Sequence, residues 1–106
     1  MVNPWAGEVA LTINGEPHAM KLTLGALAEL EDTLQTGTLV ALIERFEREE
    51  VSSRDVLALV VAGLRGGGWR GSREDLLSAD IEGGPIEAAR AAGQLLSRAF
   101  AFPEGA

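Results

Sequence analysis

The sequence of 106 residues contains no cysteine and no tyrosine, and its one histidine is His18. Without cysteine there is no disulfide bond, no zinc site built on thiolates and no thiol nucleophile. With a single histidine, few side chains remain that act as a nucleophile or a general base near neutral pH. These absences argue against an enzyme.

Basic residues are scarce, because 9 Lys and Arg stand against 16 Asp and Glu, and the net charge is −7. Such a chain repels the phosphate backbone of nucleic acids. Long apolar runs are also lacking, since none approaches the ~20 residues that cross a bilayer. Residues 1–7 show neither the basic start nor the apolar stretch of a signal peptide. We therefore expect neither nucleic acid nor a membrane as a partner, and a location in the cytoplasm.

Carboxylates are plentiful, but their spacing does not build a reactive site. Glu49-Glu50 and Glu74-Asp75 are neighbours in the sequence, whereas a glycosidase holds two acids across a cleft. The alternating oxygen ligands of a calcium or magnesium loop are also missing. We interpret these residues as solvated or capping, and predict no catalytic residue, no metal site and no cofactor.

Residues 7–24 predict a β-hairpin that turns at Asn14-Gly15, because this dipeptide favours the positive φ angles of a type I′ turn. The turn sets the register, with Ile13 opposite Glu16 and Val9 opposite Met20. In that register the apolar side chains share one face: Val9, Leu11, Ile13, Met20 and Leu22. A two-stranded hairpin is marginal alone, so this face must pack on helices.

The remainder of the chain predicts helices. After Thr23, a residue type favoured at N-caps, a leucine stripe recurs at helical spacing: Leu24, Leu27, Leu30 and Leu34. Thr38 caps a second helix, and Ser52 and Ser72 begin two more in the manner of a capping box. The helix after Ser52 is apolar around most of its circumference, which predicts the central core helix. A last helix covers about residues 86–101.

The fold class we predict is α+β. An N-terminal hairpin packs on a bundle of four to five α-helices, in a mostly helical single domain over residues 1–106. The sequence does not place the last helix relative to the hairpin.

The segment from Arg65 to Gly71 is the most unusual one, with three consecutive glycines followed by Trp69 and Arg70. A phosphate-binding loop is excluded, because the segment follows a helix and has no lysine. One interpretation is a helix end with Trp69 packed back on the body. The other is a partner contact, since Trp and Arg are enriched in interface hot spots. We therefore name Trp69, Arg65, Arg70 and, in the N-terminal arm, Trp5 as candidate partner-binding residues.

Several stretches together resemble a family of small tail proteins found in gene transfer agents and related prophages, labelled tail tube or tail assembly chaperone proteins. The resemblance rests on the stretches Asn3-Pro4, Gly7-Glu8-Val9, Asn14-Gly15, Leu22 to Glu31 and Ala62-Gly63-Leu64-Arg65. None of them is a catalytic motif. Within the longest stretch, we expect Gly25 to let the first helix approach the hairpin closely.

The resemblance implies a role in assembling a phage-like tail in the cytoplasm of a bacterial host. Our first hypothesis is a tail assembly chaperone that coats the long tape measure protein until tube subunits replace it. The alternative is a structural tail tube or connector subunit that stays in the particle. Expected partners are the tape measure or other tail proteins, and a homo-oligomer is compatible with both roles.

Overall fold

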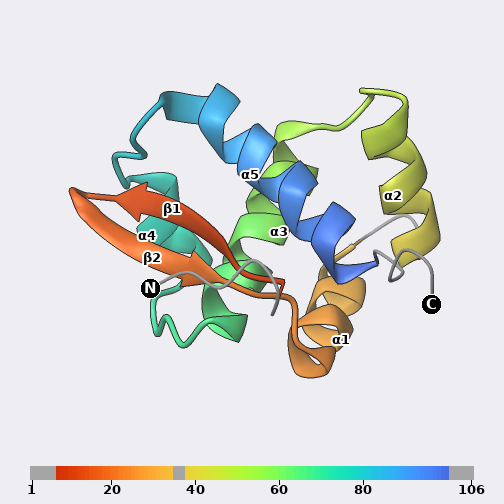
Figure 1. The fold of residues 1–106 in the computed structure, drawn as a ribbon, viewed down its shortest axis with the longest axis horizontal. Coiled ribbons are helices and arrows are strands. Elements are labelled where there is room, and N and C mark those ends of the chain that lie inside the picture. The colour runs from red at the N-terminus through yellow and green to blue at the C-terminus, as the bar shows by residue number, and fades with distance from the viewer. Residues whose placement is uncertain (1–6, 35–37, 101–106) are drawn as a thin grey trace.

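A computed structural model describes residues 7–34 and 38–100. In these residues an antiparallel hairpin precedes five helices, as Figure 1 shows. The elements are β1 (Val9–Ile13), β2 (Glu16–Met20), α1 (Leu24–Thr33), α2 (Leu39–Glu47), α3 (Ser53–Gly66), α4 (Arg73–Leu77) and α5 (Gly84–Ala99). The predicted α+β class is confirmed.

The hairpin has the predicted turn and register. Asn14 and Gly15 have φ angles of 51° and 81°, and Val9 lies opposite Met20. One face of the hairpin is buried, and its side chains are Val9, Leu11, Ile13 and Met20. The alternation of apolar residues therefore fixed which face meets the helices.

Each of the first four helices begins at the expected cap. The Thr23 hydroxyl accepts a hydrogen bond from the Ala26 amide at 3.1 Å, and Thr38 accepts one from Ala41 at 3.3 Å. α3 and α4 start with full capping boxes, at Ser52 and Ser72. These short polar side chains satisfy amides that the first helical turn leaves without partners.

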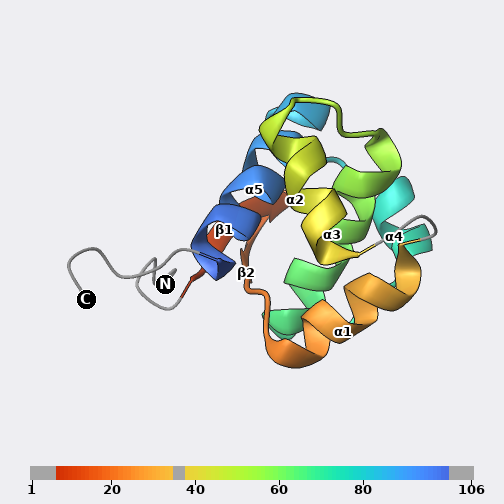
Figure 2. The same cartoon turned by 90° about the vertical axis from the view of Figure 1, so that its right-hand side faces the viewer.

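α3 is the central helix, as predicted. It contacts α1, α4, α5 and β2, and Leu59, Val60 and Leu64 on it are at most 1% exposed. Figures 1 and 2 show α1, α2, α4 and α5 arranged around it. α5 packs on α3 and on β1, which places the last helix against the hairpin. Buried alanines, such as Ala91 and Ala92, let α5 approach closely.

Glycines at the end of α3 bring that helix onto the outer edge of β2. A Cβ atom on Gly66 would lie 1.9 Å from the Lys21 carbonyl oxygen, and one on Gly67 would lie 2.0 Å from the Ala19 oxygen. The Lys21 amide also donates to the Gly63 carbonyl at 2.9 Å. The expectation that Gly25 lets the first helix approach the hairpin closely was wrong, because the nearest contact of a Cβ built there is the Thr23 hydroxyl oxygen at 4.0 Å.

The edge of β1 is covered by segments from the other end of the chain. The Asn14 amide donates to the Asp80 carbonyl at 2.8 Å, and the Glu82 amide donates to the Thr12 carbonyl at 3.0 Å. Farther along the strand, the Arg98 guanidinium donates to the Glu8 carbonyl. Both edges of the hairpin are thus partly occupied by the protein's own backbone and side chains.

One leucine of the predicted stripe faces solvent. Leu24 is 84% exposed, whereas Ala26 and Leu30 form the buried face of α1. Leu24 is the first residue of the helix, and successive residues rotate by about 100° around its axis. The buried face is centred on Ala26 and Leu30, so Leu24 lies on the far side.

Candidate functional site

The candidate contact residues lie in different surroundings. Trp69 is half-buried and packs against the core, and its indole lies where a Cβ atom on Gly71 would be, at 2.1 Å. Arg70 beside it is exposed. Trp5 lies outside the described residues. Trp69 therefore has a packing role, and a partner contact through it stays a prediction.

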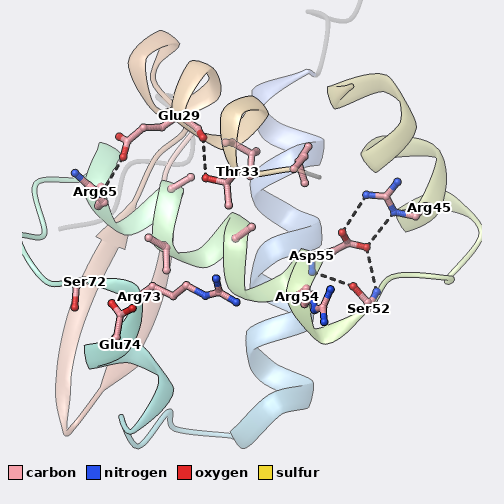
Figure 3. Close-up of a pocket in the computed structure, with 15 residues that line it drawn as sticks. Glu29, Thr33, Arg45, Ser52, Arg54, Asp55, Arg65, Ser72, Arg73 and Glu74 are labelled. Carbon is pink, nitrogen blue, oxygen red and sulfur yellow. Dashed lines mark hydrogen bonds and ion pairs between the residues drawn. The ribbon is translucent and has the colours of Figure 1, made fainter. Parts of the chain in front are cut away.

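The Arg65 side chain points toward α1 and forms an ion pair with a residue of that helix. One of its guanidinium nitrogens, Nη1, lies 2.9 Å from Glu29 Oε1, and both side chains are about half exposed. This pair spans one end of a groove that the sequence analysis did not anticipate. Figure 3 shows the pair at the side of the groove formed by α1.

The groove encloses about 790 Å³ along the outward stripe of α3. Its floor is formed by Arg54, Ala58, Val61 and Arg65, which follow one another at helical spacings of four, three and four residues. α1 forms one wall with residues that include Leu30 and Thr33, and α4 contributes Ser72, Arg73 and Glu74. The C-terminal part of α2 adds Arg45 at one end. We call this surface the arginine groove.

Two of the four arginines in the groove already have carboxylate partners. Arg45 pairs with Asp55, and Arg65 pairs with Glu29. Arg54 and Arg73 are exposed, and neither forms an ion pair with another described residue. In Figure 3 Arg73 comes from α4, and Arg54 lies at the start of α3 beside Ser52 and Asp55. The groove thus combines a floor of small apolar side chains with two uncommitted positive charges and one uncommitted carboxylate, Glu74.

The Arg45–Asp55 pair is the most enclosed charged contact of the groove. Arg45 Nε and Nη2 each lie 3.0 Å from an Asp55 carboxylate oxygen, and the Ser52 amide donates to the same carboxylate at 3.1 Å. Asp55 is 8% exposed. Because the pair is bidentate, it holds the end of α2 against the start of α3.

The electrostatics of this pair follow from its geometry. Burial by itself raises the pKa of Asp55, but the hydrogen bonds from Arg45 and the Ser52 amide, with the charge of Arg45, bring it below its ordinary value. The hydrogen bond to Asp55 in turn raises the pKa of Arg45. Both groups are therefore ionised at neutral pH, and the positive charge of Arg45 is balanced by the negative charge of Asp55.

The sequence contains one indication of the groove, which is easily missed when the helix after Ser52 is assigned to the core. The helix after Ser52 is apolar on most sides, but Arg54 and Arg65 bracket Ala58 and Val61 on a single stripe. Two arginines eleven residues apart on one face indicate an exposed stripe. Whether the stripe is a flat surface or a groove depends on α1 and α4, which no local pattern predicts.

Two further properties constrain what the described residues can do. None of the described helices combines the length and apolar character needed to cross a membrane. In residues 7–34 and 38–100, no three side chains of the His, Cys, Asp or Glu types gather closely enough to hold a metal ion.

Comparison with known proteins agrees with the resemblance seen in the residues. The chain matches the model of a family described as phage tail tube protein, GTA-gp10, over residues 6–102. Neither the comparison with curated proteins nor that with solved structures gave a match. Because the family match extends over nearly the whole sequence, the chain belongs to the GTA-gp10 family of phage tail tube proteins.

Proposed function

We propose that this protein is a structural subunit of a phage-like tail, in the tube or in a connector next to it. The observation that carries the proposal is the family description, which names a tail tube protein and applies to residues 6–102. The role is structural and includes no catalytic step. The protein would be made in the cytoplasm of a bacterial host and remain in the finished particle.

The fold indicates which surfaces would join such subunits. The edges of β1 and β2 are partly occupied by residues 80–82, by Arg98 and by the glycines at the end of α3. Strand-to-strand pairing between subunits would have to displace these internal contacts. Contacts through helical faces and the arginine groove leave the fold unchanged, so we favour them.

A second candidate role is a tail assembly chaperone that binds the tape measure protein and leaves before the tail is complete. The observation that favours it is the small sheet, since the described residues form two strands only, with covered edges. A net charge of −7 also suits a binder that must stay soluble beside an apolar partner. In this role the protein would bind a helix in a groove.

One experiment separates the two roles. Purified mature particles and the lysate of the producing cells are compared by quantitative mass spectrometry. A structural subunit is present in the particles in a fixed ratio to other tail proteins. Presence in the lysate with absence from the particles would contradict the structural role and support the chaperone.

A further inference from the structure

The outer face of α1 has no role in packing the described residues. Leu24 is 84% exposed, and Gly25 and Ala28 beside it are also exposed. Glu31 and Asp32 continue this face at the C-terminal end of the helix, and neither forms an ion pair among the described residues. We call these five residues the outer face of α1. Its first half is apolar and thin, and its second half is acidic.

The arginine groove has the complementary pattern. Ala58 and Val61 give it a low apolar floor, and Arg54 and Arg73 supply two uncommitted positive charges. From Arg54 to Arg65 the floor extends over eleven residues, or about 16 Å of helix. α1 has 10 residues and a length of about 15 Å. The groove and the helix are therefore matched in length.

Small residues on both surfaces allow two helices to approach closely. Gly25 and Ala28 leave the first half of the outer face thin, so the distance between helix axes is set by small side chains. The nearest contact of a Cβ atom built on Gly25 is the Thr23 hydroxyl oxygen at 4.0 Å, so the packing of the described residues does not require a glycine there. Leu24 then has room to bury its side chain over Ala58 and Val61.

Charge favours a second copy of this chain as the occupant. Of the 9 basic and 16 acidic residues in the sequence, four arginines and three carboxylates line the groove. The rest of the chain therefore has five basic residues against 13 acidic ones. The groove therefore has a small positive balance within an acidic protein, and another copy presents an acidic helix that complements it.

We propose that the arginine groove of one copy binds the outer face of α1 of a second copy. In this contact Leu24 covers Ala58 and Val61, while Glu31 and Asp32 face Arg54 and Arg73. The contact joins two different surfaces, so its repetition either closes into a ring or continues as a filament. The inference stands on these surfaces and goes beyond the proposed function, because it holds for a retained subunit and for a chaperone alike.

Two charge reversals test the contact, with self-association measured by sedimentation velocity over a concentration series at physiological salt. We expect R54E/R73E and E31R/D32R each to weaken self-association about tenfold or more. An equimolar mixture of the two variants should associate like the wild type, because reversed grooves then meet reversed faces. The wild-type groove of E31R/D32R and the wild-type face of R54E/R73E by themselves give one contact per pair, so association beyond a heterodimer requires the reversed groove to bind the reversed face.

The variants are suited to the test because each new charge stabilises the helix that carries it. Acidic residues near the start of α3 and α4, and basic residues near the end of α1, each agree with the helix dipole. Controls with the same changes in net charge are R48E/R90E and E47R/E50R, which lie outside the groove and the outer face. R48E/R90E also breaks two ion pairs, with Glu44 and Glu87. Circular dichroism verifies that all variants are folded.

Three outcomes would overturn the proposal. The first is a wild type that stays monomeric up to millimolar concentration. The second is self-association that the R54E/R73E and E31R/D32R variants retain at wild-type strength. The third is a mixture of these variants that associates no further than a heterodimer. None of these outcomes bears on whether the protein is retained in particles, so the proposed function is tested separately.

Discussion

Arg45 and Asp55 form a bidentate ion pair across the connection between α2 and α3, with both nitrogen–oxygen distances at 3.0 Å. Asp55 is also the third helical residue of α3, where it completes the capping box with Ser52. One carboxylate therefore caps a helix and fixes the preceding helix to it. This double role makes Asp55 the residue whose loss has the clearest expected consequence.

We predict that Asp55→Asn lowers the free energy of unfolding by about 2 kcal/mol. The change removes a charged partner from a largely buried arginine and weakens the cap. Urea denaturation measures the effect. Asp75→Asn is the matched control, because Asp75 closes the same kind of capping box at an exposed site without an arginine, and should cost about 0.5–1 kcal/mol. Equal costs at the two positions would show that Arg45 contributes nothing.

The same pair predicts a pH dependence of stability. The pKa of Asp55 is lower in the folded protein than its ordinary value of about 3.9. The unfolded chain therefore takes up the proton first as the pH falls, and the stabilisation by Asp55 is complete only above that ordinary value. It declines below it and is lost once the pH passes the folded pKa. Urea midpoints of the wild type and Asp55→Asn should differ at pH 7 and converge in acid. A constant difference would contradict this assignment.

The close approach of α3 to β2 predicts a strong effect of substitution at Gly66, the first of the three consecutive glycines. Gly66→Ala should destabilise the protein by about 2 kcal/mol, because the new methyl group meets the Lys21 carbonyl, a backbone atom that yields poorly. Thermal unfolding measures the effect. Gly93→Ala is the control, since its Cβ meets Phe46 at an ordinary 3.7 Å and should add about 0.5–1 kcal/mol. A tolerated Gly66→Ala would mean that the β2 edge moves freely.

The contact between the hairpin turn and residues 80–82 makes Asn14 a residue with two functions. It adopts a φ of 51°, and its Oδ1 accepts a hydrogen bond from the Asp80 amide at 2.9 Å. Asn14→Gly keeps the turn but loses the acceptor, for a cost of about 1 kcal/mol. Asn14→Ala also strains the left-handed backbone, and should cost about 1 kcal/mol more. Asn14→Asp, which keeps an acceptor, is the control. Equal stability of the Gly variant and wild type would contradict the bridging role.

Two substitutions in the loop after α3 distinguish an effect on folding stability from an effect on partner binding. Trp69→Ala should lower stability by about 2 kcal/mol, because the half-buried indole packs on the core. Arg70→Ala, at an exposed position, should change stability by less than about 0.5 kcal/mol. If this loop contacts a tail protein, Arg70→Ala reduces co-purification with the tape measure protein. Wild-type co-purification of Arg70→Ala would leave the loop with a structural role alone.

Local patterns predicted those elements whose causes are local. The Asn14-Gly15 turn sets the register of its own hairpin, and the Ser52 and Ser72 capping boxes begin their own helices. In each case the partners lie within a few residues, so composition and spacing contain the information. The family resemblance depended on the same local stretches, and it is confirmed by the match over residues 6–102.

Features that depend on distant segments were not predictable in the same way. The arginine groove requires α1 and α4 to flank α3, and the covered edge of β1 requires a contact between Asn14 and Asp80, 66 residues apart. The exposure of Leu24 shows the same limit, because helical spacing identifies a stripe but not where the buried face is centred. Gly66 was recognised as a helix end, whereas its contact with Lys21 belongs to tertiary packing.

The covered edges of the hairpin also set an order of events during synthesis. β1 and β2 emerge from the ribosome before Asp80, Glu82 and Arg98, which complete the β1 edge. Throughout translation, the nascent hairpin therefore presents an open edge to other chains on the same polysome. Closure of this edge therefore waits until residues 80–98 have been synthesised.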